Sequence, residues 1–82
     1  MRLPRNVSGD DLVKKLNQYG YRVTRQTGSH VRLTRSIEDK EFHLTIPKHS
    51  PLRAGTLNNI LKDLSLHLKL EKDKLIETLF YR

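Results

Sequence analysis

The sequence predicts an α+β fold, a two-layer sandwich in which helices cover one face of a three-stranded antiparallel sheet. Three observations support it: a helical apolar period near the N-terminus, three consecutive segments that alternate apolar and polar residues, and a return of the helical period in the C-terminal half. The order is αβββα with an extra C-terminal helix, the order of a double-stranded-RNA-binding domain.

The first helix is predicted from about Gly9 to Tyr19. Ser8 is a typical N-cap residue with Asp11 as its capping-box partner, and Gly20 suits the end of a helix. The apolar residues at helical spacing are Leu12, Val13, Leu16 and Tyr19.

Three strands are predicted next, joined by turns at 27–29 and 36–40. Their alternating apolar residues are Tyr21 and Val23, then Val31 and Leu33, then Phe42, Leu44 and Ile46. Because side chains alternate between the faces of a strand, this set is expected to pack on the helices. The opposite, solvent-facing side is then expected to carry His30, Arg32, Thr34, His43 and Thr45.

Pro47 is expected to end the third strand, and the loop KHSPLRAG follows. A second helix is predicted from about Thr56, a possible N-cap, with an apolar stripe of Leu57, Ile60, Leu61 and Leu64. The segment SLHLKL fits either a turn with an extended piece or a continuation of this helix. A third helix is predicted from Glu71 to Phe80.

The length of 82 residues fits one domain, residues 1–82, with no internal repeat or linker. A chain of this size buries roughly 60 to 65% of its unfolded surface, so we expect chemistry on an open face and not in a deep cavity. The absence of cysteine excludes disulfides and thiolate zinc sites. With no apolar run of membrane-spanning length and no export signal at the N-terminus, we expect a cytoplasmic protein without membrane contact.

The formal net charge of +7 indicates a polyanionic partner. Between Leu12 and Ile37 there are six basic residues and no acidic one. Arginine prevails in the strand region, and its guanidinium group suits phosphate. A nucleic acid is therefore the expected partner, and the candidate RNA contacts are Lys14, Lys15, Arg22, Ser29, Arg32 and Lys48. Arg25 and Arg35 belong to the wider pool of candidate phosphate contacts. Alternation sends Arg25 and Arg35 towards the other side or the strand ends.

His30 is the strongest candidate for a catalytic residue. It follows a Gly-Ser turn whose backbone amides suit a phosphate oxygen, and it is expected on the same face as Arg32. A neutral imidazole there fits RNA cleavage by attack of the ribose 2′-OH. A second proton carrier could be His43, His49, Tyr21 or Lys48, and the sequence does not choose among them. No role is expected for His67. The histidine spacings match no zinc pattern, so no metal or cofactor is expected.

Three segments together are specific enough to indicate a family: PRNVSGDDLVKKL with YGY, then RQTGSH, then HLTIPKHSPLRAGTLNNIL, covering residues 4–61. In order and spacing they resemble the HicA toxins, also described as YcfA-like proteins, the small mRNA interferases of HicAB toxin-antitoxin pairs. The segment DLSLHLKLEKDK differs from the family pattern in being longer and lacking glycine.

The resemblance implies a fold like the double-stranded-RNA-binding domain and a metal-independent endoribonuclease that acts on mRNA. It implies that His30 is the essential residue, that His49 supports it, and that a HicB-type antitoxin covers the active face. Two alternatives follow from the residues: a non-catalytic RNA-binding module of the same fold, and a face that serves mainly to bind an acidic protein.

Overall fold

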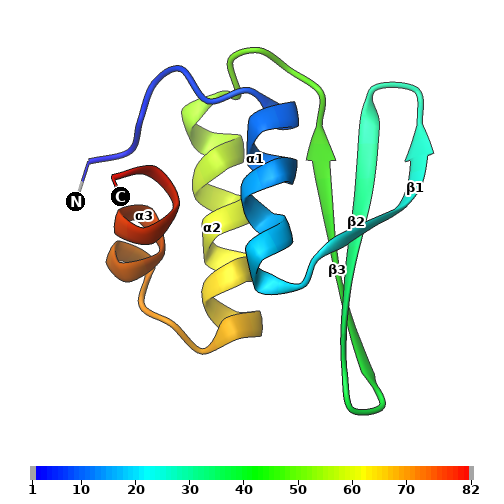
Figure 1. The fold of residues 1–82 in the computed structure, drawn as a ribbon. Helices are drawn as coiled ribbons and strands as arrows, with labels where there is room; N and C mark the ends of the chain where they lie inside the picture. The colour runs from blue at the N-terminus through cyan, green and yellow to red at the C-terminus, as the bar shows by residue number, and fades with distance from the viewer. Residues whose placement is uncertain (1, 82) are drawn as a thin grey trace.

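The computed structural model describes residues 2–81 and has the predicted order of elements (Figure 1). The bounds are α1 Gly9–Leu16, β1 Arg22–Thr27, β2 His30–Ile37, β3 Lys40–Pro47, α2 Ala54–Leu68 and α3 Lys72–Phe80. The strands form one antiparallel sheet in the order β1-β2-β3. This is the αβββα arrangement of a double-stranded-RNA-binding domain, with an additional C-terminal helix.

Helix α1 begins at Gly9 as predicted, but its α-helical part ends at Leu16, three residues before the predicted end at Tyr19. The Ser8 Oγ accepts a hydrogen bond from the Asp11 amide at 3.0 Å, which satisfies one of the free donors at the helix start. After Leu16 the chain makes a 3₁₀ turn, Asn17–Tyr19, and leaves it through Gly20 with φ of 87°.

Helix α2 differs from the prediction at its start. It begins at Ala54 with Arg53 at the N-cap position, so Thr56 lies inside the helix and does not cap it. The helix continues to Leu68, which makes SLHLKL largely helical and rules out the extended alternative. Lys69 then adopts φ of 55°, a left-handed conformation that a glycine usually takes at this point. Helix α3 follows one residue later than predicted, with Glu71 at its N-cap.

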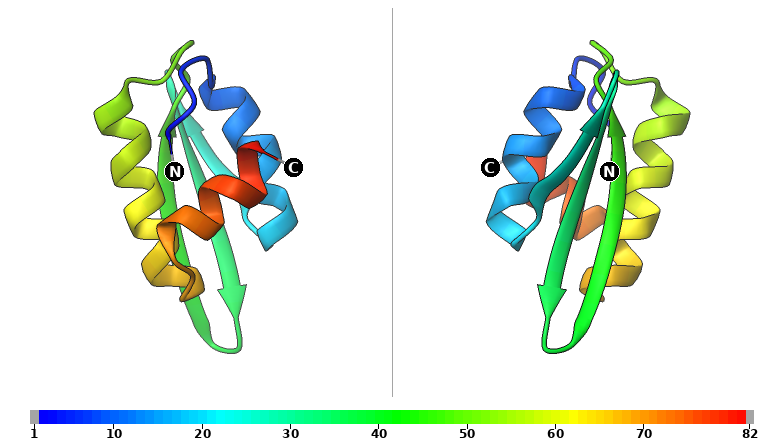
Figure 2. Two further views of the ribbon diagram at one scale, coloured as in Figure 1. Left: turned by 90° about the vertical axis from the view of Figure 1, so that its left-hand side faces the viewer. Right: turned by 90° about the vertical axis from the view of Figure 1, so that its right-hand side faces the viewer.

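The helices all lie on one side of the sheet. Helices α1 and α2 pack directly on it, and α3 crosses their outer surface, so the extra helix adds a third layer to the predicted two (Figures 1 and 2). The core between these layers is formed by buried side chains from every helix and from β2 and β3, among them Leu12, Leu33, Ile46, Leu61, Leu64, Leu75 and Ile76. Within residues 2–81 no helix covers the other face of the sheet (Figure 2, right).

Backbone hydrogen bonds join the two loops at the top of the sheet to the start of α1. The Lys48 amide donates to the Ser29 carbonyl at 2.7 Å, and the Gly9 amide donates to the His49 carbonyl at 2.9 Å. A side chain at position 9 has no room, because a Cβ there would lie 2.0 Å from the Pro47 carbonyl oxygen. The β1–β2 turn, the loop after β3 and the helix start are therefore held as one unit.

Candidate active site on the open sheet face

The uncovered face of the sheet contains two adjoining shallow hollows. The first, of about 200 Å³, is lined by Arg25, Thr27, His30, Arg32 and Thr45. The second, of about 300 Å³, is lined by Thr24, Arg25, Arg32, Thr34, Glu41 and His43. Arg25 and Arg32 line both, so the hollows form one continuous surface with a histidine at each end and two arginines between. The prediction that His30, Arg32, Thr34, His43 and Thr45 share a face is correct.

His30 opens β2 at the end of the first hollow. It pairs with Thr27 across β1 and with Pro47 across β3, and the turn before it contains Gly28 with φ of 55°. The side chain is exposed, and among residues 2–81 it makes no hydrogen bond or ion pair. Both ring nitrogens are thus free to act on a bound group.

Arg25 reaches this face through an irregularity in β1. The pairing of β1 with β2 shifts between Val23 and Arg25, so that Thr24 is an extra residue and Arg25 lies directly opposite Arg32. The expectation that alternation sends Arg25 to the other side is wrong, because a bulge inverts the alternation beyond it. Val23 is also not buried as expected: it is 51% exposed on this edge strand.

The Arg25–Arg32 pair has the electrostatics of an anion site. Like charges directly opposite each other on neighbouring strands destabilise a sheet. Neither guanidinium group forms an ion pair with an acidic side chain within residues 2–81. An unneutralised pair on an exposed face has the charge and the donors that a phosphate group requires.

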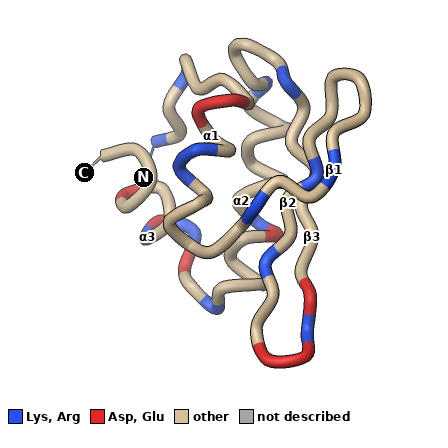
Figure 3. Tube along the Cα trace, turned by 45° about the vertical axis from the view of Figure 1, so that its right-hand side comes forward, with Lys and Arg blue, Asp and Glu red and all other residues tan. Residues whose placement is uncertain are grey.

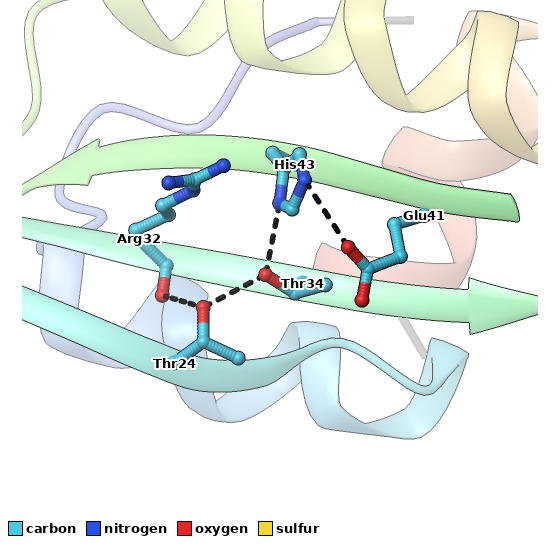
Figure 4. A network of polar contacts seen from close by, with 5 residues as sticks. All are labelled: Thr24, Arg32, Thr34, Glu41 and His43. Carbon is cyan, nitrogen blue, oxygen red and sulfur yellow. Dashed lines mark hydrogen bonds and ion pairs between the residues drawn. The ribbon is translucent and has the colours of Figure 1, made fainter.

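His43 is held in a chain of polar contacts in the second hollow (Figure 4). Its Nδ1 lies 2.9 Å from the Thr34 Oγ1, which lies 2.7 Å from the Thr24 Oγ1. Its Nε2 lies 3.8 Å from the Glu41 Oε1. Thr34 was expected to face solvent; it lies on that side of the sheet but is only 8% exposed.

The other predicted contact residues lie apart from the two hollows. Arg22 lines a hollow with Asn17, Gly20 and Tyr21, and Lys14 and Lys48 line a groove between α1 and β1. Lys15 lies over the ring of Phe80 on α3, with 5.9 Å from its Nζ to the ring centroid. Ser29 and His49 are exposed, in the loops joined by the backbone hydrogen bonds above.

Tyr21 and His67 belong to the helix side of the sheet. Tyr21 is 0% exposed and its hydroxyl lies 2.8 Å from the His67 Nδ1. Burial raises the pKa of Tyr21 above its usual value of 10.0; the Arg35 guanidinium lowers it and the Asp63 carboxylate raises it. Tyr21 therefore does not serve as a proton carrier for a group bound at His30. A larger hollow of about 370 Å³ beside His67 lies on this same side, at the end of α2.

The sequence does not indicate Thr24 or Glu41 as site residues, and its strand alternation directs Arg25 away from the site. Thr24 and Arg25 depend on the bulge, which no residue type in the strand announces. Glu41 lies beside the predicted β2–β3 turn, and no sequence motif marks it as a site residue. Within residues 2–81 no three histidine, aspartate or glutamate side chains converge as a metal-binding group. No helix in the same part of the chain has the length and apolar character to cross a membrane.

Comparison with known protein families identifies a matching family profile. The profile of the family described as HicA toxin of bacterial toxin-antitoxin systems matches residues 9–66, which contain α1, the whole sheet and most of α2. No curated protein and no solved structure matches the chain. The matched segment includes both hollows and His30. Because it spans well over half of the sequence, the chain belongs to the HicA toxin family of bacterial toxin-antitoxin systems.

Proposed function

We propose that this toxin is a metal-independent endoribonuclease that cleaves mRNA, with His30 as its essential catalytic residue. The observation that carries the proposal is the juxtaposition in one open hollow of an unengaged imidazole and two unneutralised arginines, Arg25 and Arg32. A shallow, solvent-exposed hollow on a basic face suits a long polyanion better than a small metabolite.

The proposed reaction is attack of a ribose 2′-OH on the adjacent phosphodiester. Arg25 and Arg32 bind the phosphate and stabilise the charge that grows on it. A nitrogen of His30 takes the proton from the 2′-OH while the O2′–P bond forms. The P–O5′ bond breaks and the departing oxygen takes a proton, which leaves a 2′,3′-cyclic phosphate and a 5′-OH end.

A second group must give a proton to the departing oxygen. His49 is the first choice, because it lies in the loop that is hydrogen-bonded to the turn before His30. Lys48 belongs to the same loop and is the second choice. His43 is excluded from this role by distance: it pairs with Thr34, four residues beyond His30 on β2, or roughly 13 Å along the strand.

The proposed partners are RNA and a HicB-type antitoxin. The open face carries the proposed substrate-binding residues, and no helix of the described part of the chain covers it (Figure 2). A protein that binds this face therefore excludes RNA by occupying it. An antitoxin with an acidic surface would bind the same arginines that hold the phosphate, and association would be fast at low salt.

The test compares wild type with His30→Ala on a labelled single-stranded RNA in excess EDTA, with circular dichroism confirming that both are folded. We expect wild type to cut and the variant to lose roughly 10² to 10⁴-fold in rate, the usual contribution of a positioned base. A substrate with a single 2′-deoxyribose at the cut site should resist wild type.

Three other outcomes would change the proposal. If wild type cuts RNA without EDTA but not in its presence, the reaction depends on a metal ion. If both proteins bind RNA and neither cuts, the chain is an RNA-binding module of this fold. Cutting by the folded His30→Ala variant at the wild-type rate removes His30 from the mechanism.

A further inference from the structure

The second hollow is not used by the proposed reaction, although it shares Arg25 and Arg32 with the first. Its histidine lies too far along the sheet to reach a phosphate at His30, since proton transfer requires hydrogen-bond contact. An RNA chain whose phosphate rests on the two arginines nevertheless extends in both directions from them. A chain that runs from the arginines along β2 towards Thr34 passes over His43.

The ring of His43 is held in one orientation by contacts at both of its nitrogens. Thr34 contacts its Nδ1 at 2.9 Å and Glu41 approaches its Nε2 at 3.8 Å, while the side chain stays 37% exposed. Thr34 is fixed in turn by Thr24 at 2.7 Å. An aromatic ring that is held in place and open to solvent is a surface on which an unpaired base stacks, and an arginine plane beside it serves the same purpose.

The charges at this end of the sheet favour a base over a phosphate. The acidic residues of the sheet gather at the β2–β3 turn and just after it, at Glu38, Asp39 and Glu41 (Figure 3). The Glu41 side chain is 64% exposed, and its carboxylate repels a phosphate but accepts hydrogen bonds from the N–H groups of a base.

We propose that Glu41, His43 and Arg32 form a nucleobase-binding subsite that holds a base near the cleaved phosphate. The base stacks on His43 or Arg32, and Glu41 accepts from its exocyclic amino group. Cytosine, adenine and guanine carry such a group. Uracil presents carbonyl oxygens on both sides of its single N–H, and the carboxylate repels them. The subsite therefore selects against uracil. This inference rests on the proposed function, because it places the base next to the phosphate that is cleaved at His30.

The first test is cleavage of a random-sequence RNA pool by wild type and Glu41→Gln, with the cut sites sequenced. We expect wild type to select against uracil at one fixed position away from the cut. The glutamine amide both donates and accepts, so it tolerates uracil, and the discrimination should fall by about fivefold or more, the effect of losing one base contact. Glu77→Gln on α3 makes the same chemical change outside the sheet and should leave the pattern unaltered.

A binding test separates this proposal from the proposed function. In the His30→Ala background, oligo(C) should bind more tightly than oligo(U), and adding Glu41→Gln should reduce that ratio. If the ratio falls but wild type never cuts RNA, the subsite stands and the nuclease does not. If wild type cuts and neither the pattern nor the ratio responds to Glu41→Gln, the subsite is wrong and the nuclease stands. If the protein binds no RNA, the nuclease proposal and the subsite proposal are both wrong, and the hollow binds a protein partner instead.

Discussion

Tyr21 has its phenol hydroxyl in the protein interior, against the Nδ1 of His67 at 2.8 Å. The ring of His67 is also packed against Phe42, with 4.9 Å between ring centroids. Burial favours the neutral phenol, so the pKa of Tyr21 in the folded protein lies above its usual value of 10.0. The hydroxyl thus links the residue that precedes β1 to α2.

The raised pKa of Tyr21 predicts a loss of stability at alkaline pH. The unfolded chain releases the phenol proton near pH 10.0, before the folded chain does. The contribution to the free energy of unfolding is therefore complete below that pH and is lost as the pH rises through the folded pKa. Urea denaturation at increasing pH should show this decline in wild type and less of it in Tyr21→Phe. Tyr19→Phe is the matched control, and an equal decline in all three proteins would contradict the assignment.

At the scale of elements, the sequence predicts β2 and β3 better than β1. The alternation around His30 and Arg32 is correct because β2 is the central strand and pairs regularly with β3 over its whole length. In β1 the bulge at Thr24 inverts the alternation, and edge strands are where bulges concentrate. Because neither valine, threonine nor arginine specifies a bulge, the position of Arg25 in the site could be found only from the structure.

At the end of α2, the local sequence pattern alone does not determine whether the chain is helical or extended. Leu64, Leu66 and Leu68 alternate as in a strand, but Leu64 also completes the helical stripe that begins at Leu57. Burial of that stripe extends the helix to Leu68 and leaves Leu66 76% exposed. Tertiary packing thus outweighed the alternating pattern.

Replacing glycine by alanine should have opposite effects on stability at Gly9, which lies against the loop after β3, and at Gly55, which has open space around it. In Gly9→Ala the new methyl group meets the Pro47 carbonyl, so we expect a loss of about 1 to 3 kcal/mol in the free energy of unfolding. In Gly55→Ala nothing lies within 4 Å of the methyl group, and the better helix propensity of alanine should add up to about 1 kcal/mol. Urea denaturation measures both, and changes of the same sign would argue against the close approach at Gly9.

Across the whole molecule the net charge of +7 is unevenly distributed. The acidic residues of the sheet lie at the β2–β3 turn (Figure 3). On the face around His30, by contrast, Arg25 and Arg32 form no ion pair with an acidic side chain of residues 2–81. Lys62 and Lys74 are also exposed, but they lie on α2 and α3. These helices are on the opposite side of the sheet from the open face (Figure 2). Net charge raises the affinity for any polyanion, but the distribution determines which lysines and arginines contact it.

This distribution predicts how RNA binding depends on salt. In the His30→Ala background, the logarithm of the binding constant for a single-stranded RNA should fall linearly with the logarithm of salt concentration, by about 0.7 for each phosphate contact. Changing Arg25 and Arg32 together to glutamine removes a contact from each strand and should make the slope shallower by about 0.7 per lost contact. Lys62→Gln with Lys74→Gln removes the same net charge from the helix side and should leave the slope nearly unchanged. Equal effects of the two pairs would mean that RNA responds to total charge alone. A selective effect of the arginine pair would locate the phosphates between His30 and His43, where both the proposed cleavage and the proposed base subsite require them.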